Sequence, residues 1–207
     1  YNDYFEKFLD RPINILEIGI FEGKSLLMLK EFFPEATIYS IDINPASVAL
    51  NLGSNIHTYL CSQDDFPNLQ DIFNDKKFDI IIEDGSHMTS HQQTSLGFFF
   101  PYLNSGGIYV CEDLHTSYSP GYIDTAVTTM NILENYQITK QFECSLLDEK
   151  QITYLNENIM DLQIYERTKN AIMCYKCKRT NLFRESMCVC GVNLSPSDRS
   201  ITSILTH

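Results

Sequence analysis

The chain has 207 residues, of which 43% are hydrophobic and 12% aromatic, which is enough for one well-cored α/β domain. Fifteen Lys and Arg against 27 Asp and Glu give a formal charge of -12, so the chain lacks the basic surface that binds nucleic-acid phosphates. We therefore expect no nucleic-acid partner. No apolar run reaches the length of a membrane span and no secretory signal pattern is found, so we expect a cytoplasmic protein with no membrane association. Because the chain starts with Tyr1 rather than Met, we expect it to be part of a longer gene product.

The first half of the chain alternates short apolar runs with segments of helical spacing, which is typical of a doubly wound parallel sheet. Residues 1–10 predict a short helix that Pro12 ends. Strands are predicted over 13–16, 37–41 and 56–60, with a helix over 24–33 and another starting near Pro45. Apolar runs over 78–82 and 108–111 predict two further strands, the first buried on both faces. Ligands of such a sheet bind at the carboxyl ends of its strands.

The second half has a weaker pattern. Residues 124–136 predict a helix, and the polar segment 142–158 is expected to be an irregular, mobile cover over the site. Residues 162–165 and 171–175 predict a C-terminal antiparallel hairpin, which makes the expected fold a Rossmann-like, doubly wound, mostly parallel seven-stranded sheet. We expect the domain to occupy 1–176 and a Cys-containing extension to occupy 177–207, ending in a loose tail over 195–207.

A glycine turn follows the first predicted strand. A dinucleotide site has a glycine first in this turn, but Glu17 stands there and its charge would repel a diphosphate, so NAD is disfavoured. The E-x-G-x-x-x-G pattern suits a ligand without phosphate and with a positive end. Glu17 can receive an ammonium group, and Gly19 and Gly23 let the backbone approach closely. S-adenosylmethionine has these features, whereas a tight turn with a buried acid is the plain structural alternative.

The ends of the next strands supply the other candidate cofactor contacts. Asp42 ends the second strand and is expected to accept both ribose hydroxyls. After the third strand, Gln63 with Asp64 or Asp65 is expected to reach the adenine. Two polar residues beside the turn and the fourth strand, Ser25 and Glu83, complete the set expected to bind the cofactor.

Carboxylates gather at the ends of the fourth and fifth predicted strands. If these strands are neighbours in a parallel sheet, their ends lie roughly 5 Å apart and bring Asp84, Glu112 and Asp113 around one point. Three clustered carboxylates call for a cation. Each acid also has a plainer interpretation, as a turn residue, a helix cap or a solvated strand end.

These motifs carry a family resemblance. NILEIGIFEGKSLLMLKEFFPEATIYSIDINP, residues 14–45, resembles the first half of a class I S-adenosylmethionine-dependent methyltransferase. IIEDGSH, the Gln-containing helix after it and FPYLNSGGIYVCEDLHTSY together resemble the metal-dependent sugar O-methyltransferases of macrolide and related glycoside pathways, of the mycinamicin and macrocin type. The resemblance covers about the first 120 residues best. It implies that Asp84, Glu112 and Asp113 hold Mg²⁺ and that His87 is the general base.

The chemistry of the residues agrees with that implication. A sugar hydroxyl is a weak nucleophile near neutral pH, and Mg²⁺ on three carboxylates leaves positions for a vicinal diol while His87 takes the proton. His115 and Tyr118 are expected to contact the substrate, a sugar, nucleotide sugar or glycoside, and a homo-oligomer stays open. The alternatives are a Mg²⁺-dependent catechol-type O-methyltransferase and a non-catalytic scaffold, which has no reason to keep mutually repelling acids together.

Four cysteines close to the C-terminus could bind Zn²⁺. Cys174 and Cys177 are separated by two residues, but Cys188 and Cys190 are separated by only one, and Cys174 falls in a predicted strand. The spacing therefore disfavours a zinc site, and free cysteines are the alternative.

Overall fold

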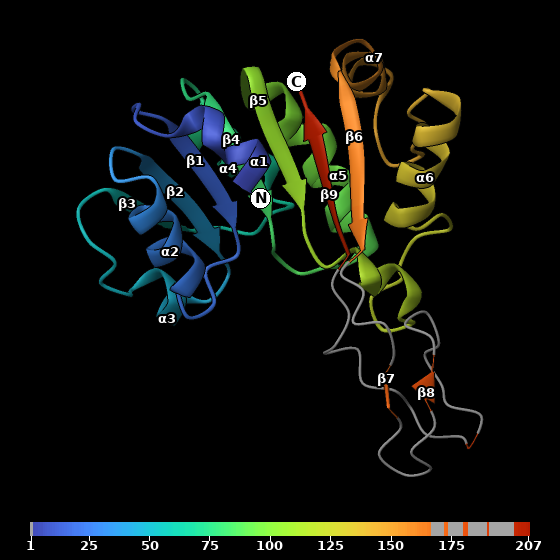
Figure 1. Cartoon of the computed structure of the whole chain (residues 1–207), viewed down its shortest axis with the longest axis horizontal. Helices are drawn as coiled ribbons and strands as arrows, with labels where there is room; N and C mark the ends of the chain where they lie inside the picture. Colours follow the sequence, from blue (N-terminus) through green and yellow to red (C-terminus); the bar gives the residue numbers. More distant parts are fainter. Residues whose placement is uncertain (1, 167–171, 174–179, 182–189, 191–200) are drawn as a thin grey trace.

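The computed structural model describes residues 2–166, 172–173, 180–181, 190 and 201–207, and its centre is a seven-stranded sheet of order β3-β2-β1-β4-β5-β9-β6 (Figure 1). β1 to β5 pair in parallel, and β9 pairs antiparallel with both β5 and β6. The sheet strands are β1 Asn14–Ile18, β2 Thr37–Asp42, β3 Ile56–Leu60, β4 Phe78–Glu83, β5 Leu103–Cys111, β6 Asp161–Glu166 and β9 Ile201–Thr206. A separate short pair joins β7 Ile172–Met173 to β8 Thr180–Asn181.

Helices cover both faces of the sheet. In one hydrophobic cluster, α1 and α2 pack on one face of the sheet. In a second cluster, α4, α5, α6 and α7 pack on the other face. The helices are α1 Asn2–Phe5, α2 Lys24–Phe32, α3 Pro45–Val48, α4 Phe66–Phe73, α5 Thr89–Phe99, α6 Thr129–Thr139 and α7 Glu149–Asn158, with short 3-10 turns η1 Glu6–Phe8, η2 Phe100–Tyr102 and η3 Leu114–Tyr118. The doubly wound fold expected from the sequence is confirmed.

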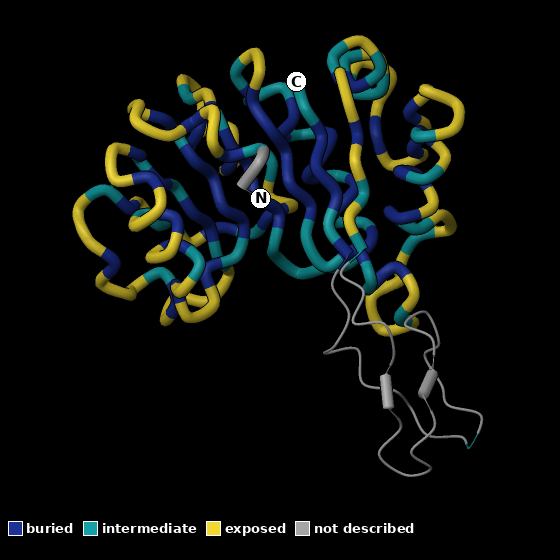
Figure 2. Tube along the Cα trace, in the orientation of Figure 1, coloured by how far each residue is buried: buried dark blue, intermediate teal, exposed yellow. Residues whose placement is uncertain are grey.

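The central strands are buried along their length because helices cover both of their faces (Figure 2). Their registers align the strand ends: Ile18 lies opposite Glu83, and Glu83 lies opposite Cys111. The residues that follow these three strands therefore emerge side by side at one edge of the sheet. The chain order reverses between β1 and β4, which is where ligands bind in open α/β sheets.

The C-terminal strands differ from the prediction. β6 is antiparallel as expected, but its partner is β9, and 172–173 pair with β8 outside the sheet. β9 lies between β5 and β6, with Ile204 opposite Val110, so it is buried between two strands and is not a loose tail. The boundary expected at residue 176 is therefore wrong in this respect, because residues 201–206 belong to the same sheet.

Two helices also differ from the expectation: one begins later, and the other lies in a segment expected to be irregular. α6 starts at Thr129 rather than 124, because Thr128 caps it with a side chain that accepts from the Asn131 N–H. Part of the segment expected to be irregular is the regular helix α7, which opens with a capping box between Asp148 and Gln151.

Two further expectations, on the zinc site and on membrane spans, can be compared only with the residues that the structure describes. Cys174, Cys177 and Cys188 of the candidate zinc group lie outside them, and only Cys190 is described. Among the described helices, none is long and apolar enough to cross a membrane.

Candidate functional site

A pocket of about 490 Å³ opens at the carboxyl ends of the strands. It is lined from β1 by Ile18 and Gly19, from the β2 end by 41–44, from the β3 end by 61–63, and from the loop after β4 by 84–87. His91 of α5 and Asp113 after β5 complete the wall next to that loop. The pocket volume is in the range of small-molecule sites, roughly 300–1,000 Å³.

The glycine turn approaches the loop after β4 closely. Gly19 has φ +99°, and a Cβ built on it would lie 2.3 Å from the Asp84 carbonyl oxygen. Any side chain at this position would therefore push the two loops apart. Gly23 has φ +72° and begins α2, where a Cβ would meet Leu52, so it shapes the turn but does not line the pocket.

Glu17 is buried behind the turn. The Ser25 hydroxyl donates to its Oε1, whereas Oε2 is buried and has no hydrogen-bond partner among the described residues. Burial raises the pKa of Glu17 to about 7; the Ser25 hydrogen bond lowers the pKa and the charge of Glu112 raises it. A buried acceptor of this kind is satisfied by an incoming cationic or hydrogen-bond-donating group.

Asp42 lines the pocket but is already engaged. Its Oδ2 accepts from the N–H groups of Ile20 at 2.8 Å and Phe21 at 3.1 Å, and its Oδ1 accepts from the Asn44 N–H at 2.8 Å. Asp42 therefore ties the glycine turn to the end of β2, which the sequence did not predict. A carboxylate has about four acceptor positions, so roughly one remains for a ligand hydroxyl rather than the two expected.

Gln63 and Glu83 form a buried network beneath the loop after β4. Gln63 Nε2 donates to Glu83 Oε1 at 2.9 Å and to Ser95 Oγ at 3.1 Å, while Gln63 Oε1 accepts from the Ser86 N–H at 2.8 Å. The Cys111 thiol lies 3.3 Å from Glu83 Oε2, and burial raises the pKa of Glu83. Gln63 lines the pocket, but the fully buried Glu83 does not. The hydrogen bonds of Glu83 therefore stabilise the loop after β4 rather than contact a ligand.

The two acids that follow Gln63 lie outside the pocket lining. Asp65 is the N-cap of α4 and does not line the pocket. Asp64 accepts from the Ser62 hydroxyl, which lowers its pKa, and lies 3.5 Å from His91 Nε2. His91 Nδ1 is in turn 2.7 Å from the Ser86 hydroxyl. His91 is therefore a pocket residue that continues a polar chain from Asp64 to Ser86.

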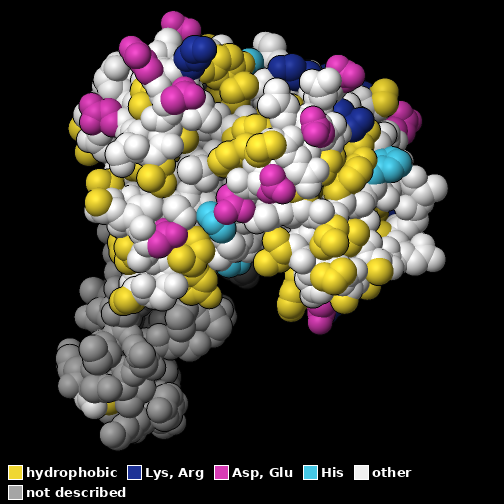
Figure 3. All heavy atoms as spheres, turned by 180° about the vertical axis from the view of Figure 1, so that it is seen from behind, with side chains coloured by type: hydrophobic (Ala, Val, Ile, Leu, Met, Phe, Trp, Pro, Cys, Tyr) yellow, Lys and Arg dark blue, Asp and Glu magenta, His cyan; other side chains and the backbone are white. Residues whose placement is uncertain are grey.

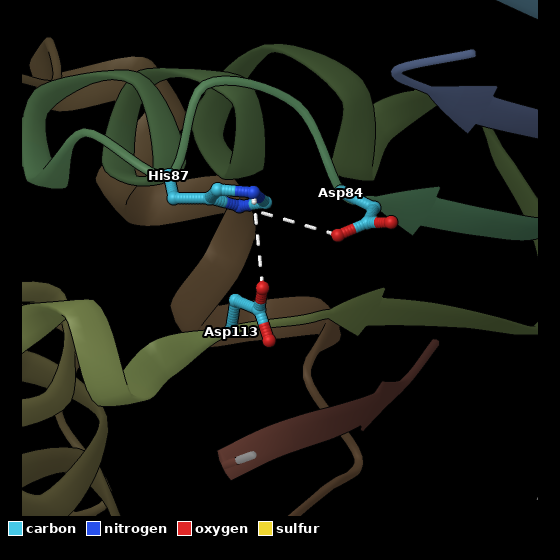
Figure 4. Close-up of side chains that lie close together, drawn as sticks. All are labelled: Asp84, His87 and Asp113. Atoms are coloured by element: carbon cyan, nitrogen blue, oxygen red, sulfur yellow. Dashed lines mark ion pairs between the residues drawn. The ribbon is translucent and has the colours of Figure 1, made fainter. Parts of the chain in front are cut away.

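Asp84, His87 and Asp113 converge at the ends of β4 and β5 (Figure 4). His87 Nδ1 lies 4.0 Å from Asp84 Oδ1, and His87 Nε2 lies 3.8 Å from Asp113 Oδ2. One ligand atom from each residue lies within 4.8 Å of the others, which fits a shared metal ion. On the face shown in Figure 3, histidine and acidic side chains lie next to one another with apolar side chains around them.

Negative charge concentrates at this point. Burial and the charges of Glu112, Asp113, Glu17 and Glu83 raise the pKa of Asp84 to about 8. Glu112 is thus close enough to act on Asp84, but its carboxylate does not belong to the group of converging ligand atoms. The structure therefore brings together two of the three acids expected to share a metal, Asp84 and Asp113, with the His87 ring beside them.

Both His87 and Asp113 have left-handed backbones, with φ 60° and 53°. Such positions cost of the order of 1–3 kcal/mol and persist where surrounding contacts enforce them. The buried Thr116 hydroxyl lies 3.1 Å from the His87 carbonyl oxygen and 2.8 Å from that of Asp113. Thr116 therefore joins the two strained residues, a role that no sequence pattern indicated.

The two expected substrate contacts lie on η3. His115 Nδ1 is 3.6 Å from Asp113 Oδ1, so His115 lies next to one of the converging carboxylates, although it does not line the pocket. Tyr118 is exposed at the end of η3 and also lies outside the pocket lining.

Comparisons with known proteins agree with this geometry. A family model described as a methyltransferase domain matches residues 16–114. The mycinamicin VI 2''-O-methyltransferase of Micromonospora griseorubida is 32% identical over 180 residues, covering 80% of this chain and 45% of the relative. The 8-demethyl-8-(2-methoxy-alpha-L-rhamnosyl)-tetracenomycin-C 3'-O-methyltransferase of Streptomyces olivaceus is 38% identical over 130 residues, covering 59% of this chain and 33% of the relative.

A solved structure gives the same result. The MycE methyltransferase from the mycinamycin pathway, in complex with Mg and SAH, superposes with a TM-score of 0.66 at 31% identity, over 80% of this chain and 45% of that one. The chain thus spans from about a third to just under half of these relatives' length. Sheet order, turn motif and relatives together identify a methyltransferase domain in this chain, which is similar to the macrolide sugar O-methyltransferases.

Proposed function

We propose that the protein transfers a methyl group from S-adenosylmethionine to a hydroxyl of a sugar or glycoside, with Mg²⁺ bound at the carboxylates and His87 as general base. The observation that carries the proposal is the convergence of Asp84, His87 and Asp113 on one point at the wall of the pocket. Relatives named for O-methylation of macrolide and tetracenomycin sugars support the acceptor class.

The residues around the glycine turn fit S-adenosylmethionine. Glu17 offers a buried carboxylate oxygen with no partner among the described residues, which suits the amino group of the methionine end. Gly19 brings backbone, not side chain, to the pocket wall, and Asp42 keeps about one acceptor position for a ribose hydroxyl. Exposed Ile43 next to Asp42 gives an apolar surface for the adenine ring. We propose Gln63 and Asp64 as rim contacts of the same ligand.

The group at the ends of β4 and β5 fits a hard divalent cation. Asp84 and Asp113 supply the carboxylate oxygens that Mg²⁺ prefers, and we propose Glu112 as a nearby third acid. The raised pKa of Asp84 marks a place where the described residues leave negative charge uncompensated. Bound there, Mg²⁺ would lower the pKa of a chelated hydroxyl and hold that hydroxyl in place.

His87 then has a defined task. Its ring stands between the two carboxylates, so it faces a hydroxyl held near them and can take the hydroxyl proton. The acceptor oxygen attacks the sulfonium methyl carbon, an O–C bond forms as the C–S bond breaks, and S-adenosylhomocysteine leaves. Asp84 and Asp113 stabilise the resulting imidazolium through charge. Glu83 and Gln63 keep the loop that carries His87 in position.

The test is methyl transfer by the purified protein. Incubation with S-adenosylmethionine, Mg²⁺ and a panel of glycosides, nucleotide sugars and catechols should give glycosides that gain one methyl by mass spectrometry. EDTA should abolish transfer and added Mg²⁺ should restore it, while calorimetric binding of S-adenosylhomocysteine changes little. Methylation of catechol alone would favour the catechol-type alternative. Full activity in EDTA would contradict the metal assignment.

His87→Ala separates base from metal site. We expect turnover to fall roughly 10²–10⁴-fold, with S-adenosylhomocysteine binding retained. His57→Ala is the matched control, because His57 lies on β3 away from the pocket lining. Equal turnover of the His87→Ala and His57→Ala proteins would refute the general-base role.

A further inference from the structure

The segment 119–127, which we call the strap, connects η3 to α6 and is fixed to the start of α5. The Thr89 N–H donates to the Tyr122 carbonyl oxygen at 2.9 Å, and the Tyr122 N–H donates to the Ser119 carbonyl oxygen at 2.9 Å. Gln93 Nε2 donates to the Val127 carbonyl oxygen at 2.8 Å. The strap is thus held by backbone bonds at its middle and by a side chain at its end.

Asp124 strengthens this attachment. Its Oδ1 accepts from the Ser90 N–H at 2.8 Å and from the Thr89 hydroxyl at 2.9 Å, and its Oδ2 accepts from the Ser90 hydroxyl at 2.6 Å. Met88 has no side-chain oxygen to cap α5, so Asp124 performs the capping from a distance in sequence. Although burial alone would raise the pKa of Asp124, the hydrogen bonds from Ser90 and Thr89 lower it.

The attachment fixes Tyr122 beside the general base. The Tyr122 ring lies 6.4 Å from the His87 ring between centroids, with an interplanar angle of 58°. Despite this fixed position, Tyr122 is 40% exposed, and its neighbour Ile123 is also exposed. The strap therefore presents an exposed aromatic ring beside His87, where a ligand can reach it.

We infer that Tyr122 is the platform on which the acceptor sugar lies, an inference that rests on the proposed methyl transfer to a glycoside. A pyranose has an apolar face of C–H groups and a rim of hydroxyls. The apolar face matches the exposed ring of Tyr122. The hydroxyl rim matches His87, which lies beside Tyr122, and the carboxylates of Asp84 and Asp113, which converge with His87. Stacking on the ring orients the ring hydroxyls toward the base, so Tyr122 determines acceptor binding rather than cofactor binding.

The experiment measures binding without turnover. The probe is methyl α-L-rhamnopyranoside, because one relative is named for a rhamnosyl acceptor. With Mg²⁺ and S-adenosylhomocysteine present, saturation-transfer NMR of the wild type should mark the ring C–H protons of the probe. Tyr122→Ala should weaken probe binding about tenfold, whereas Tyr122→Phe keeps it, because the ring and not the hydroxyl carries the contact. The affinity for S-adenosylhomocysteine should not change in either variant.

Tyr165→Ala is the matched control, since Tyr165 is 49% exposed but lies on the edge strand β6. Equal probe binding by wild type and Tyr122→Ala, or no binding by the wild type, would overturn the inference. Methyl transfer to glycosides with an unchanged KM in Tyr122→Ala would overturn it while leaving the proposed function intact. Binding of the probe that depends on Tyr122, without any methyl transfer, would instead remove the proposed function and leave the platform.

Discussion

Replacement of Glu17 by Gln tests whether the buried carboxyl behind the glycine turn ionises in the folded protein. Burial raises the pKa of Glu17 from its ordinary 4.5 to about 7. A carboxyl whose folded-state pKa exceeds its unfolded value supports the fold at low pH and loses that support as pH rises through the folded value. Each tenfold change in proton affinity is worth about 1.4 kcal/mol, so raising the pH from about 5 to about 8 should cost the folded protein roughly 2.5 kcal/mol.

Urea unfolding followed by circular dichroism measures this cost, since the chain contains no Trp. Gln keeps the shape of Glu17 and stays neutral, so the difference in unfolding free energy between wild type and Glu17→Gln isolates the ionisation. We expect the wild type to lose roughly 2.5 kcal/mol relative to Glu17→Gln between about pH 5 and about pH 8. Parallel pH profiles for the two proteins would refute the reasoning.

The same substitution links stability to the ligand. Because the charged form of Glu17 attracts an ammonium group, S-adenosylhomocysteine should bind more tightly as the pH rises through about 7. Calorimetry in buffers of different ionisation enthalpy should detect proton release in the wild type and none in Glu17→Gln. Identical proton release in both proteins would place the titrating group elsewhere.

Two further predictions concern the acceptor half. The pKa of Asp84 is raised to about 8, so without metal the ionisation of Asp84 destabilises the fold as pH rises. Asp84→Asn should therefore raise the thermal unfolding midpoint near pH 9. The variant should also lose the stabilisation that Mg²⁺ gives the wild type. A Mg²⁺-dependent rise that persists in Asp84→Asn would contradict this. Thr116→Val should lower stability by about 1 kcal/mol and reduce kcat with little effect on S-adenosylhomocysteine affinity, whereas Thr116→Ser should retain both, because only the hydroxyl reaches the His87 and Asp113 carbonyl oxygens. Indistinguishable Val and Ser variants would show that this hydroxyl does not position the base.

The parallel part of the sheet could be predicted because each strand carries its own signal. The β-branched run of β4 and the apolar end of β5 are buried on both faces, and local sequence records that burial. β9 could not be found in this way. Its Ser and Thr residues resemble a polar tail, and only its position between β5 and β6 buries Ser203. The helix α7 did have a local signal, the capping box between Asp148 and Gln151.

The site shows the same division. Glu17 and Gly19 lie in one continuous strand and turn, so their proximity follows from the chain itself. The engagement of Asp42 by the backbone of Ile20 and Phe21 depends on two loops meeting, and no pattern within either loop reports it. The strand pattern placed Glu83 at the end of a strand. It could not predict that the Glu83 side chain accepts a hydrogen bond from Gln63 beneath the loop.

The acceptor half depends on contacts between segments far apart in sequence. His87 and Asp113 have left-handed backbones, which cost of the order of 1–3 kcal/mol each, and the Thr116 hydroxyl lies within hydrogen-bonding distance of both of their carbonyl oxygens. The strap adds Tyr122 through a cap that Asp124 supplies to α5. Since no residue of 114–127 lines the pocket beside Gly19 and Asp42, we propose that changes in η3 and the strap alter acceptor choice and leave cofactor binding unchanged. Acceptor specificity should therefore be sought by varying 114–127 and measuring KM for the glycoside against the affinity for S-adenosylhomocysteine.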